Sequence, residues 1–295
     1  MKIIGKVVGI NTSGDLLNII INDKDSNSYN LKIDESLGIN ITINDVYEFE
    51  YEEKENSTRT LNVITNIKNI RDFDYDNKID NLKIFYKSSP YTVKEAEYII
   101  NSYIEKIENK ILKDIVVYLL KKYHNDYFIY PAATKMHHNY IGGLAYHIIG
   151  MLKLSDGMLD TYKYINKDYV YAGIILHDIA KVDELTDAIN PQYSDQGQLV
   201  GHLVMGALDV KLAAKELGYS DTEEEMILIH ILISHHGIPQ FGAAKKPMVA
   251  EAMLIWYIDS IDSKFRVLEE ELSNTKEKEF TGAIGVIEKS KIYKI

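Results

Sequence analysis

The hydrophobic pattern of this 295-residue sequence changes its period near Pro90, and that change constrains the fold more than any other feature. Residues 1–70 contain short runs rich in Ile, Val and Tyr, separated by Asn, Asp, Ser and Gly. Such runs are typical of β-strands joined by turns. After Pro90, apolar residues recur every three or four positions, which is the pattern of amphipathic helices. We therefore expect a β domain followed by a mostly α-helical one.

The first part holds five candidate strands, with the sequences KIIGKVVGI, LLNIIIND, SYNLKID, VYEFEYEE and TLNVITNI. Five strands in so short a stretch suit a small closed barrel such as an OB-fold. Such barrels often bind single-stranded nucleic acid through aromatic and basic side chains, and the aromatic candidates here are Tyr29, Tyr47, Phe49 and Tyr51. The segment YEFEYEEKEN is strongly acidic, however, which is unfavourable for contact with a phosphate backbone. An ordinary structural role is at least an equal alternative for each of these aromatic residues.

The predicted fold class is α+β with two domains. The sequence divides into an OB-like β-barrel at residues 1–72, a linker at 73–90 and an α-helical domain with a C-terminal tail at 91–295. Thr92 and Glu95 have the spacing of a capping box at the start of the first helix of that domain. Ser220 and Glu223 have the same spacing before a later helix.

Composition narrows the chemistry of any metal site, because the sequence contains no cysteine. Disulfides and thiolate ligands are excluded, and a metal would be bound by His, Asp and Glu. The formal net charge of −11 argues against a broad basic surface that holds nucleic acid by counterion release. Bound cations can still supply positive charge locally. No leader pattern and no membrane-spanning apolar run is visible, so we expect a cytoplasmic protein with no membrane partner.

Histidines are concentrated in the helical part, where eight of the nine lie between residues 137 and 236. They fall in four separate segments, MHHNYIGGLAYH, LHDIAK, GHLVMG and IHILISHHG. A single histidine on an apolar helix is most often a hydrogen-bonded core residue. Several helices that each supply one, with carboxylates nearby, favour a divalent metal site. His138 lies in a predicted loop, where contact with a substrate and an ordinary surface role are equal alternatives.

His177 and Asp178 stand side by side after an apolar run, in the segment GIILHDIAKVDELT. A buried carboxylate without a partner is costly, so Asp178 must be paired, exposed or bound to a metal. Adjacent helical residues diverge by about 100°, so both can reach one metal only near a helix end. A carboxylate can bridge two metals, which makes this pair a suitable nucleus for a one- or two-metal centre. The alternative is an ion pair between Asp178 and Lys181 at i+3.

A further carboxylate ligand is expected in the segment EAMLIWYIDSIDSK, where Asp259 and Asp262 are three residues apart and share a helix face. Asp259 follows an apolar run and needs a partner there. Asp262 is closer to the polar segment SKFRVLEEE. We therefore favour Asp259 as a metal ligand and expect Asp262 to point to solvent.

One set of residues resembles the H…HD…D pattern of the HD superfamily of metal-dependent phosphohydrolases: His147, His177, Asp178 and Asp259. The segments PAATKMHHNYIGGLAYH, LHDIAKVDEL, GHLVMG and SHHGIPQF are similar to those of the YhaM-type exoribonucleases, which join an OB-fold to an HD domain. The likeness covers residues 130–265 strongly. Two positions depart from it, because Tyr146 stands where Glu is usual and Ala180 stands where Gly is commoner.

The resemblance implies a metal-dependent 3′→5′ exonuclease that hydrolyses single-stranded RNA, with single-stranded DNA as a further substrate, by metal-activated water. It implies one or two divalent ions, with manganese favoured over Mg, Fe, Ni and Zn. The implied metal ligands are His147, His177, Asp178 and Asp259, with a second site formed by His202, His235 and His236 that shares Asp178. Asp178 and Lys181 carry over as catalytic residues, and Lys181 is placed near the scissile phosphate.

Two other functions stay open on the sequence. The first is an HD phosphohydrolase that acts on small nucleotides, in which the acidic barrel serves oligomerisation or regulation. The second is a non-catalytic regulatory module whose centre binds a metal or a nucleotide. A homo-oligomeric state is also left open.

Overall fold

The structure is a computed structural model that describes residues 1–13, 16–34, 40–56, 59–134 and 140–295. It divides into two compact units, Met1–Lys87 and Ser88–Ile295, each with its own hydrophobic core. None of the helices in these described ranges is both long enough and apolar enough to cross a membrane.

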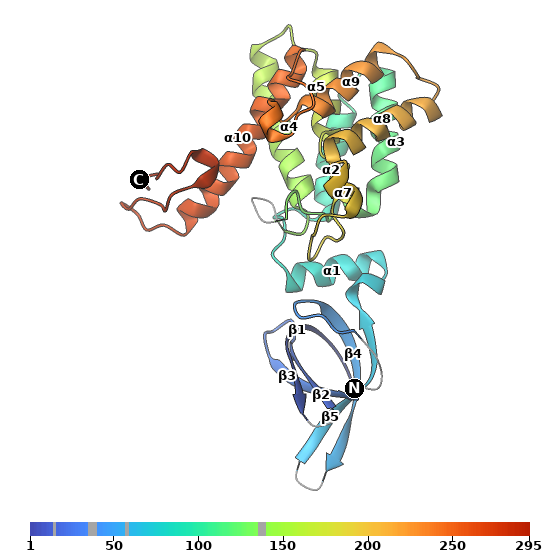
Figure 1. Cartoon of the computed structure of the whole chain (residues 1–295), viewed down its shortest axis with the longest axis vertical. Coiled ribbons are helices and arrows are strands. Elements are labelled where there is room, and N and C mark those ends of the chain that lie inside the picture. Colours follow the sequence, from blue (N-terminus) through green and yellow to red (C-terminus); the bar gives the residue numbers. More distant parts are fainter. Residues whose placement is uncertain (14–15, 35–39, 57–58, 135–139) are drawn as a thin grey trace. The chain divides into compact units, whose positions relative to one another are not determined.

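The first unit is built around a closed five-stranded barrel with the strand order β1-β2-β3-β5-β4 (Figure 1). The strands are β1 Lys2–Ser13, β2 Leu16–Asn22, β3 Ser28–Asp34, β4 Val46–Asn56 and β5 Arg59–Asn69. Paired strands are antiparallel except for β3 with β5, and the pairing of β1 with β4 closes the barrel. The small barrel predicted from five short alternating runs is therefore confirmed.

Alternation of polarity decides which side chains face the barrel core. Ile19 and Ile21 of β2, two residues apart, are both fully buried, as expected for a strand with one face in a core. Tyr47, Phe49 and Tyr51 of β4 belong to the same core and are at most 9% exposed. These three rings are therefore packing residues, and their interpretation as a stacking surface for nucleic acid is wrong.

A 3-10 turn, η2 Ile70–Asp72, and a helix, α1 Tyr75–Phe85, follow the barrel within the first unit. The Asp74 side chain begins α1 as its N-cap, because it accepts a hydrogen bond from the Asn77 backbone N–H. Part of the segment 73–90 is thus helical, and the domain boundaries at its two ends stay a prediction.

The second unit is a bundle of helices (Figure 1). They are α2 Val93–Ile104, α3 Lys110–Tyr127, α4 Gly143–Thr161, α5 Lys167–Leu176, α6 Lys181–Glu184, α7 Asp195–Leu199, α8 His202–Glu216, α9 Glu223–Ser234 and α10 Ala250–Ser273. The capping box of Thr92 and Glu95 begins α2 as predicted. The second predicted box is wrong, because Thr222 rather than Ser220 is the N-cap of α9.

Helix α5 runs through the centre of this bundle, and every residue from 170 to 180 is buried. It packs against α3, α4, α9 and α10. Gly173 permits this close approach, since a Cβ atom there would lie 2.6 Å from Ile255 Cδ1 and 2.8 Å from Ile231 Cγ2. The helix therefore carries the two polar residues that follow it, His177 and Asp178, into the middle of an apolar core.

Candidate metal centre

His177 and Asp178 lie where α5 ends, and His177 is the C-cap of that helix. Both side chains are buried, because the residues have exposed fractions of 0% and 2%. The chain turns directly afterwards, since the Lys181 N–H bonds to the Asp178 carbonyl oxygen and α6 begins at Lys181. A helix end is where adjacent side chains can face one point, so the pair meets the geometric requirement for shared coordination.

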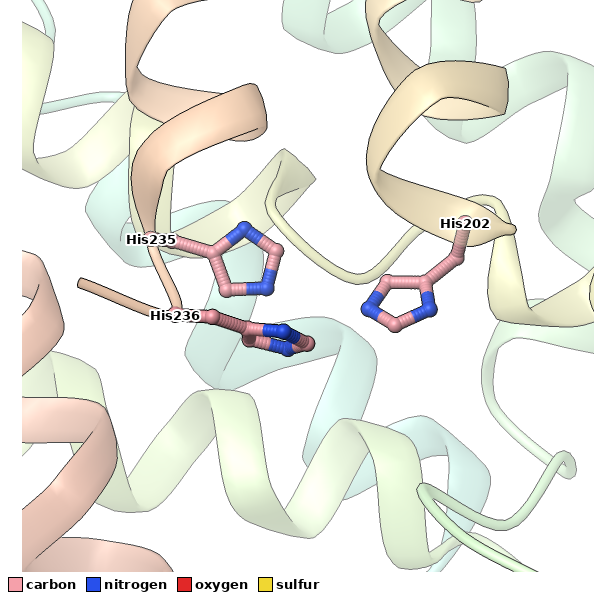
Figure 2. Close-up of side chains that lie close together, drawn as sticks. All are labelled: His202, His235 and His236. Atoms are coloured by element: carbon pink, nitrogen blue, oxygen red, sulfur yellow. The ribbon is translucent and has the colours of Figure 1, made fainter. Parts of the chain in front are cut away.

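Other helices bring four more imidazoles and a carboxylate to the same place, namely His147 from α4, His202 at the start of α8, His235 and His236 after α9, and Asp259 from α10. Figure 2 shows the rings of His202, His235 and His236 gathered together. The ring centroids of His235 and His236 are 4.4 Å apart, and those of His202 and His236 are 5.2 Å apart. His177 joins the cluster, with its centroid 4.8 Å from that of His235 and 5.5 Å from that of His147.

The ligand atoms fall into three overlapping groups, and within each group these atoms lie within 4.8 Å of one another. The groups are His202, His235 and His236; His147, His177 and Asp259; and His177, Asp178 and His235. The last group shares one histidine with each of the others. Asp178 therefore stands between two sets of ligands, one of which we name the 202 set and the other the 147 set, after their first residues.

Main-chain carbonyl groups orient three of the five rings. Nδ1 of His177 lies 2.8 Å from the Ile174 oxygen, and Nδ1 of His235 lies 2.7 Å from the Leu232 oxygen. His236 does the same with the Phe241 oxygen at 2.7 Å. A carbonyl oxygen only accepts hydrogen bonds, so Nδ1 of each ring carries the proton and donates it. In its neutral form, each of these rings keeps Nε2 as a lone-pair donor for a metal.

Carboxylates orient the other two rings. Oε1 of Glu184 lies 2.8 Å from Nδ1 of His202 and also accepts the His202 backbone N–H at 3.0 Å. Oδ2 of Asp262 lies 2.7 Å from Nδ1 of His147. Such carboxylate–histidine pairs are common behind metal ligands, where they fix the ring and increase its basicity.

Among the residues that the structure describes, four buried polar atoms at this centre make no hydrogen bond: Nε2 of His177, Nε2 of His202, Nε2 of His235 and Oδ1 of Asp178. The His202 and His235 nitrogens lie 3.3 and 3.7 Å from Asp178 Oδ1 without the geometry of a hydrogen bond. Leaving several such atoms without partners in one place is costly, and native structures rarely do so. Divalent cations bound at these ligand groups would satisfy these atoms, and imidazole and carboxylate ligands suit Mn, Fe, Ni or Zn. The residues present therefore fit a metal.

The protonation states near Asp178 are those of metal ligands. Burial raises the pKa of the Asp178 carboxyl group, but the charges of Lys181 and His177 outweigh it and hold that pKa well below its usual value. Burial, together with the neighbouring His177 and His236 rings, lowers the pKa of His235 far below its usual value. Asp178 is ionised and His235 is neutral, which are the forms that coordinate cations.

His147 is held differently, because it lies between two carboxylates. Its Nε2 is 3.3 Å from Oδ1 of Asp259, and its Nδ1 contacts Asp262. Burial lowers the pKa of His147, but the hydrogen bonds to Asp259 and Asp262 outweigh this and raise it to about 10. Without a metal the ring is therefore protonated, and a cation at Nε2 would displace that proton.

Lys181 reaches back to the centre from the start of α6. Its Nζ lies 2.8 Å from Oδ2 of Asp178 and donates to the Ala132 carbonyl oxygen at 2.7 Å. The ion pair considered from the sequence is thus present. Lys181 also lines a cavity of about 330 Å³, together with His147, Asp178, His202, His236 and Asp259. Lys181 therefore both pairs with Asp178 and lines the cavity beside the metal centre.

The expectation that Asp262 points to solvent is wrong. Asp262 is 5% exposed and contacts His147. The reason lies on α4, where Gly150 has no side chain and leaves space that a Cβ atom would take from Oδ1 of Asp262. The spacing offered a signal, since Asp262 follows Asp259 by one helical turn and Gly150 follows His147 by one turn.

The four other histidines lie away from the centre or outside the described residues. His137 and His138 fall in the segment 135–139, which the structure does not describe. His124 is on the surface of α3 and pairs with Glu97 at 2.9 Å. Nε2 of His230 accepts the Met248 backbone N–H at 2.9 Å, which is a structural contact. The ligand roles of the seven metal-site candidates stay a prediction, although the structure brings all seven together.

Comparison with known proteins supports the same centre. The HD domain family model matches residues 144–264, which include His147, the His177–Asp178 pair and Asp259. The chain is 38% identical over 217 residues to the 3′-5′ exoribonuclease YhaM of Bacillus licheniformis, an alignment that covers 73% of this chain and 69% of that protein. It is 36% identical over 228 residues to YhaM of Bacillus subtilis (strain 168), covering 77% and 72%. YhaM of Geobacillus sp. (strain WCH70) is 40% identical over 210 residues, covering 71% and 64%.

The alignments with these relatives cover 210 to 228 residues and are therefore longer than the segment 144–264 that the family model matches. A likeness of this length does not arise by chance. The fold agrees, since a barrel precedes the helical unit that holds the buried His and Asp side chains. The chain therefore belongs to the YhaM family of 3′-5′ exoribonucleases, and it is an HD-domain hydrolase.

Proposed function

We propose that this chain removes nucleotides from the 3′ end of single-stranded RNA, and of single-stranded DNA as a further substrate, in a metal-dependent reaction. The observation that carries the proposal is the set of four buried polar atoms that have no hydrogen-bond partner in the described part of the chain and lie beside an open cavity. The relatives named exoribonucleases supply the direction and the polymer. The metal centre supplies the groups that would hydrolyse the phosphodiester bond.

Two ions are the arrangement that the ligand groups favour. The 147 set and the 202 set each offer three side chains, and Asp178 contacts members of both through different oxygens. Such a carboxylate is suited to bridge two cations. Manganese is the first ion to test, because these nitrogen and oxygen ligands suit it and no thiolate is present. Cations bound there would lower the pKa of a water molecule and polarise the phosphoryl oxygens.

Lys181 would hold positive charge beside the phosphate. Burial lowers the pKa of its amino group, but the Asp178 carboxylate outweighs this and raises it above its usual value, so the group stays charged. Its contacts with Asp178 and the Ala132 carbonyl oxygen fix the ammonium group in one place. A charge fixed in advance stabilises the developing charge on phosphoryl oxygens without reorganisation during the reaction.

The size of the cavity is consistent with attack at a chain end. At about 330 Å³ it lies at the lower end of ligand pockets, which range from roughly 300 to 1,000 Å³. A pocket of this size is that of a small ligand such as a single nucleotide. The same volume favours a second candidate function, hydrolysis of small nucleotides, which a comparison of mononucleotide and oligonucleotide turnover would separate.

A gel assay with 5′-labelled single-stranded RNA and Mn²⁺ tests the proposal. The wild type should give a ladder that shortens from the 3′ end, and both a chelator and the substitution Asp178→Ala should abolish it. Asp160→Ala is the matched control, because Asp160 is an 86% exposed aspartate of the same unit and should leave the ladder unchanged. Intact RNA after incubation with the wild type and Mn²⁺ would overturn the proposal.

A further inference from the structure

The cavity beside the metal centre has lining residues of two chemical kinds. Its charged and imidazole side chains belong to the centre. Its other lining includes Ala132, Ala133, Leu185 and Tyr193, which neither coordinate a metal nor carry charge in the proposed reaction. A ligand that fills this cavity must therefore have an anionic part and an uncharged part that tolerates apolar contact.

Tyr193 is the aromatic member of this uncharged lining, and its ring is accessible. It is 49% exposed, whereas Leu185 and Ala132 are each 4% exposed. Within the part of the chain that the structure describes, its ring stacks on no other ring and its hydroxyl group makes no hydrogen bond with another side chain. Half-exposed aromatic rings beside a cavity are suited to stacking against a flat ligand group.

The backbone holds Tyr193 in a fixed relation to the metal centre. Tyr193 forms an antiparallel bridge with Leu185, directly after α6. The Ser194 N–H bonds to the Glu184 carbonyl oxygen at 2.9 Å, and the Thr186 N–H bonds to the Gln192 carbonyl oxygen at 2.9 Å. Glu184 is the residue that orients His202 through its carboxylate. The same short segment thus positions a metal-site histidine and the aromatic ring.

We propose that Tyr193 forms a nucleobase subsite, in which its ring stacks on the base of the 3′-terminal nucleotide while the adjoining phosphate lies at the metal centre. The proposal rests on the function proposed above and adds the group that is recognised. Stacking on an aromatic ring is tolerant of sequence, because every base has a flat face, and it contributes a factor of about 5 to 150 in affinity. The subsite would therefore select for a base without selecting which base.

Binding of two small ligands tests the subsite without any turnover. Ribose 5-phosphate has a hydroxyl group where adenosine 5′-monophosphate has the base, and the affinities of both for the Mn²⁺-loaded protein can be measured by calorimetry. The wild type and Tyr193→Phe should bind the nucleotide at least 5-fold more tightly than the sugar phosphate. Tyr193→Leu should lose that preference. All three proteins should bind ribose 5-phosphate equally, which controls for the fold and for the metal centre.

A kinetic measurement then separates failure of the subsite from failure of the proposed function. Two RNA substrates are compared, one with an ordinary 3′-terminal nucleotide and one with an abasic residue there. The wild type should favour the ordinary end through a lower KM, and Tyr193→Leu should process both ends alike. If RNA is degraded but Tyr193→Leu keeps the preference for a base, the subsite is wrong and the exonuclease stands.

The opposite result is equally distinct. If the wild type prefers adenosine 5′-monophosphate over ribose 5-phosphate and Tyr193→Leu does not, yet no RNA is degraded, the subsite stands and the exonuclease function is wrong. Equal affinity of the wild type for the two small ligands, or binding of neither, overturns the subsite whatever happens to RNA.

Discussion

The barrel unit and the helical unit bury polar groups to very different extents. In the described part of the barrel unit, the buried polar residues are Asn18, Lys32 and Asp45. The helical unit buries the metal-centre residues His147, His177, Asp178, Glu184, His202, His235 and Asp262. The barrel core is an apolar packing arrangement, whereas the helical core must also hold ionised groups by hydrogen bonds and ion pairs. The candidate catalytic residues therefore lie in the unit whose core buries more ionisable side chains, although burying such groups is costly.

The largest expected effect tests the barrel side of this comparison. Phe49 is fully buried in the barrel core, so Phe49→Ala should destabilise the barrel by about 3–5 kcal/mol. Hydrogen exchange of peptides from β4 and β5 measures the loss. The Mn²⁺ affinity of the helical unit should stay the same, and a parallel loss of Mn²⁺ affinity would show that the two cores are not independent.

The next effect should appear on the helical side alone. Mn²⁺ at about 100 times its Kd should stabilise the helical unit by about 2.7 kcal/mol, because it binds the folded form. Trp256, the only tryptophan in the sequence, lies in α10 and reports urea unfolding of this unit by fluorescence. Asp178→Ala is the control, and it should remove the stabilisation. A shift of equal size in that variant would mean that Mn²⁺ acts elsewhere.

A smaller effect is expected at Asp262, a buried carboxylate that belongs to none of the three ligand groups. Asp262→Ala removes the acceptor that orients His147 and should weaken Mn²⁺ binding by about 10–100-fold. Asp262→Asn keeps an acceptor of similar shape and should lose less affinity. Calorimetry with Mn²⁺ measures both, and equal affinities for the wild type and Asp262→Ala would count against a positioning role.

The smallest effect separates stability from chemistry within the helical unit. Thr92→Ala removes the N-cap of α2 and should destabilise this unit by about 1 kcal/mol in urea unfolding followed by Trp256 fluorescence. Thr92→Ser keeps the capping hydroxyl group and should be close to the wild type. Mn²⁺ affinity should not change in either variant. A large loss of affinity would indicate that the centre depends on packing far from its ligands.

The parts of the fold that could be predicted are those that local pattern determines. Strand alternation predicted the five-stranded barrel, and the position of Thr92 and Glu95 predicted the start of α2. The cap of α9 was misplaced because two hydroxyl residues, Ser220 and Thr222, stand near the helix start and spacing alone does not choose between them. Competing local signals of this kind are resolved by the three-dimensional path of the chain.

The candidate site was harder to predict because its contacts join segments far apart in the sequence. The residue types and the helix end at His177 pointed to the centre. Asp262 was misplaced because its neighbours in sequence are polar, while its neighbour in space is Gly150, 112 positions before it. Tyr193 was not identified at all, since a lone tyrosine in a loop carries no pattern. The surroundings of Asp262 and Tyr193 depend on contacts between distant segments, which a local hydrophobic pattern does not indicate.

The contrast between carbonyl-held and carboxylate-held rings has a consequence for how this family can vary. A main-chain oxygen cannot be removed by a point mutation, so the orientation of His177, His235 and His236 is protected against most sequence change. The rings of His202 and His147 depend instead on the replaceable side chains of Glu184 and Asp262. Each set of ligands thus contains one adjustable histidine. A single substitution could tune one metal position over evolutionary time and leave the other as it is.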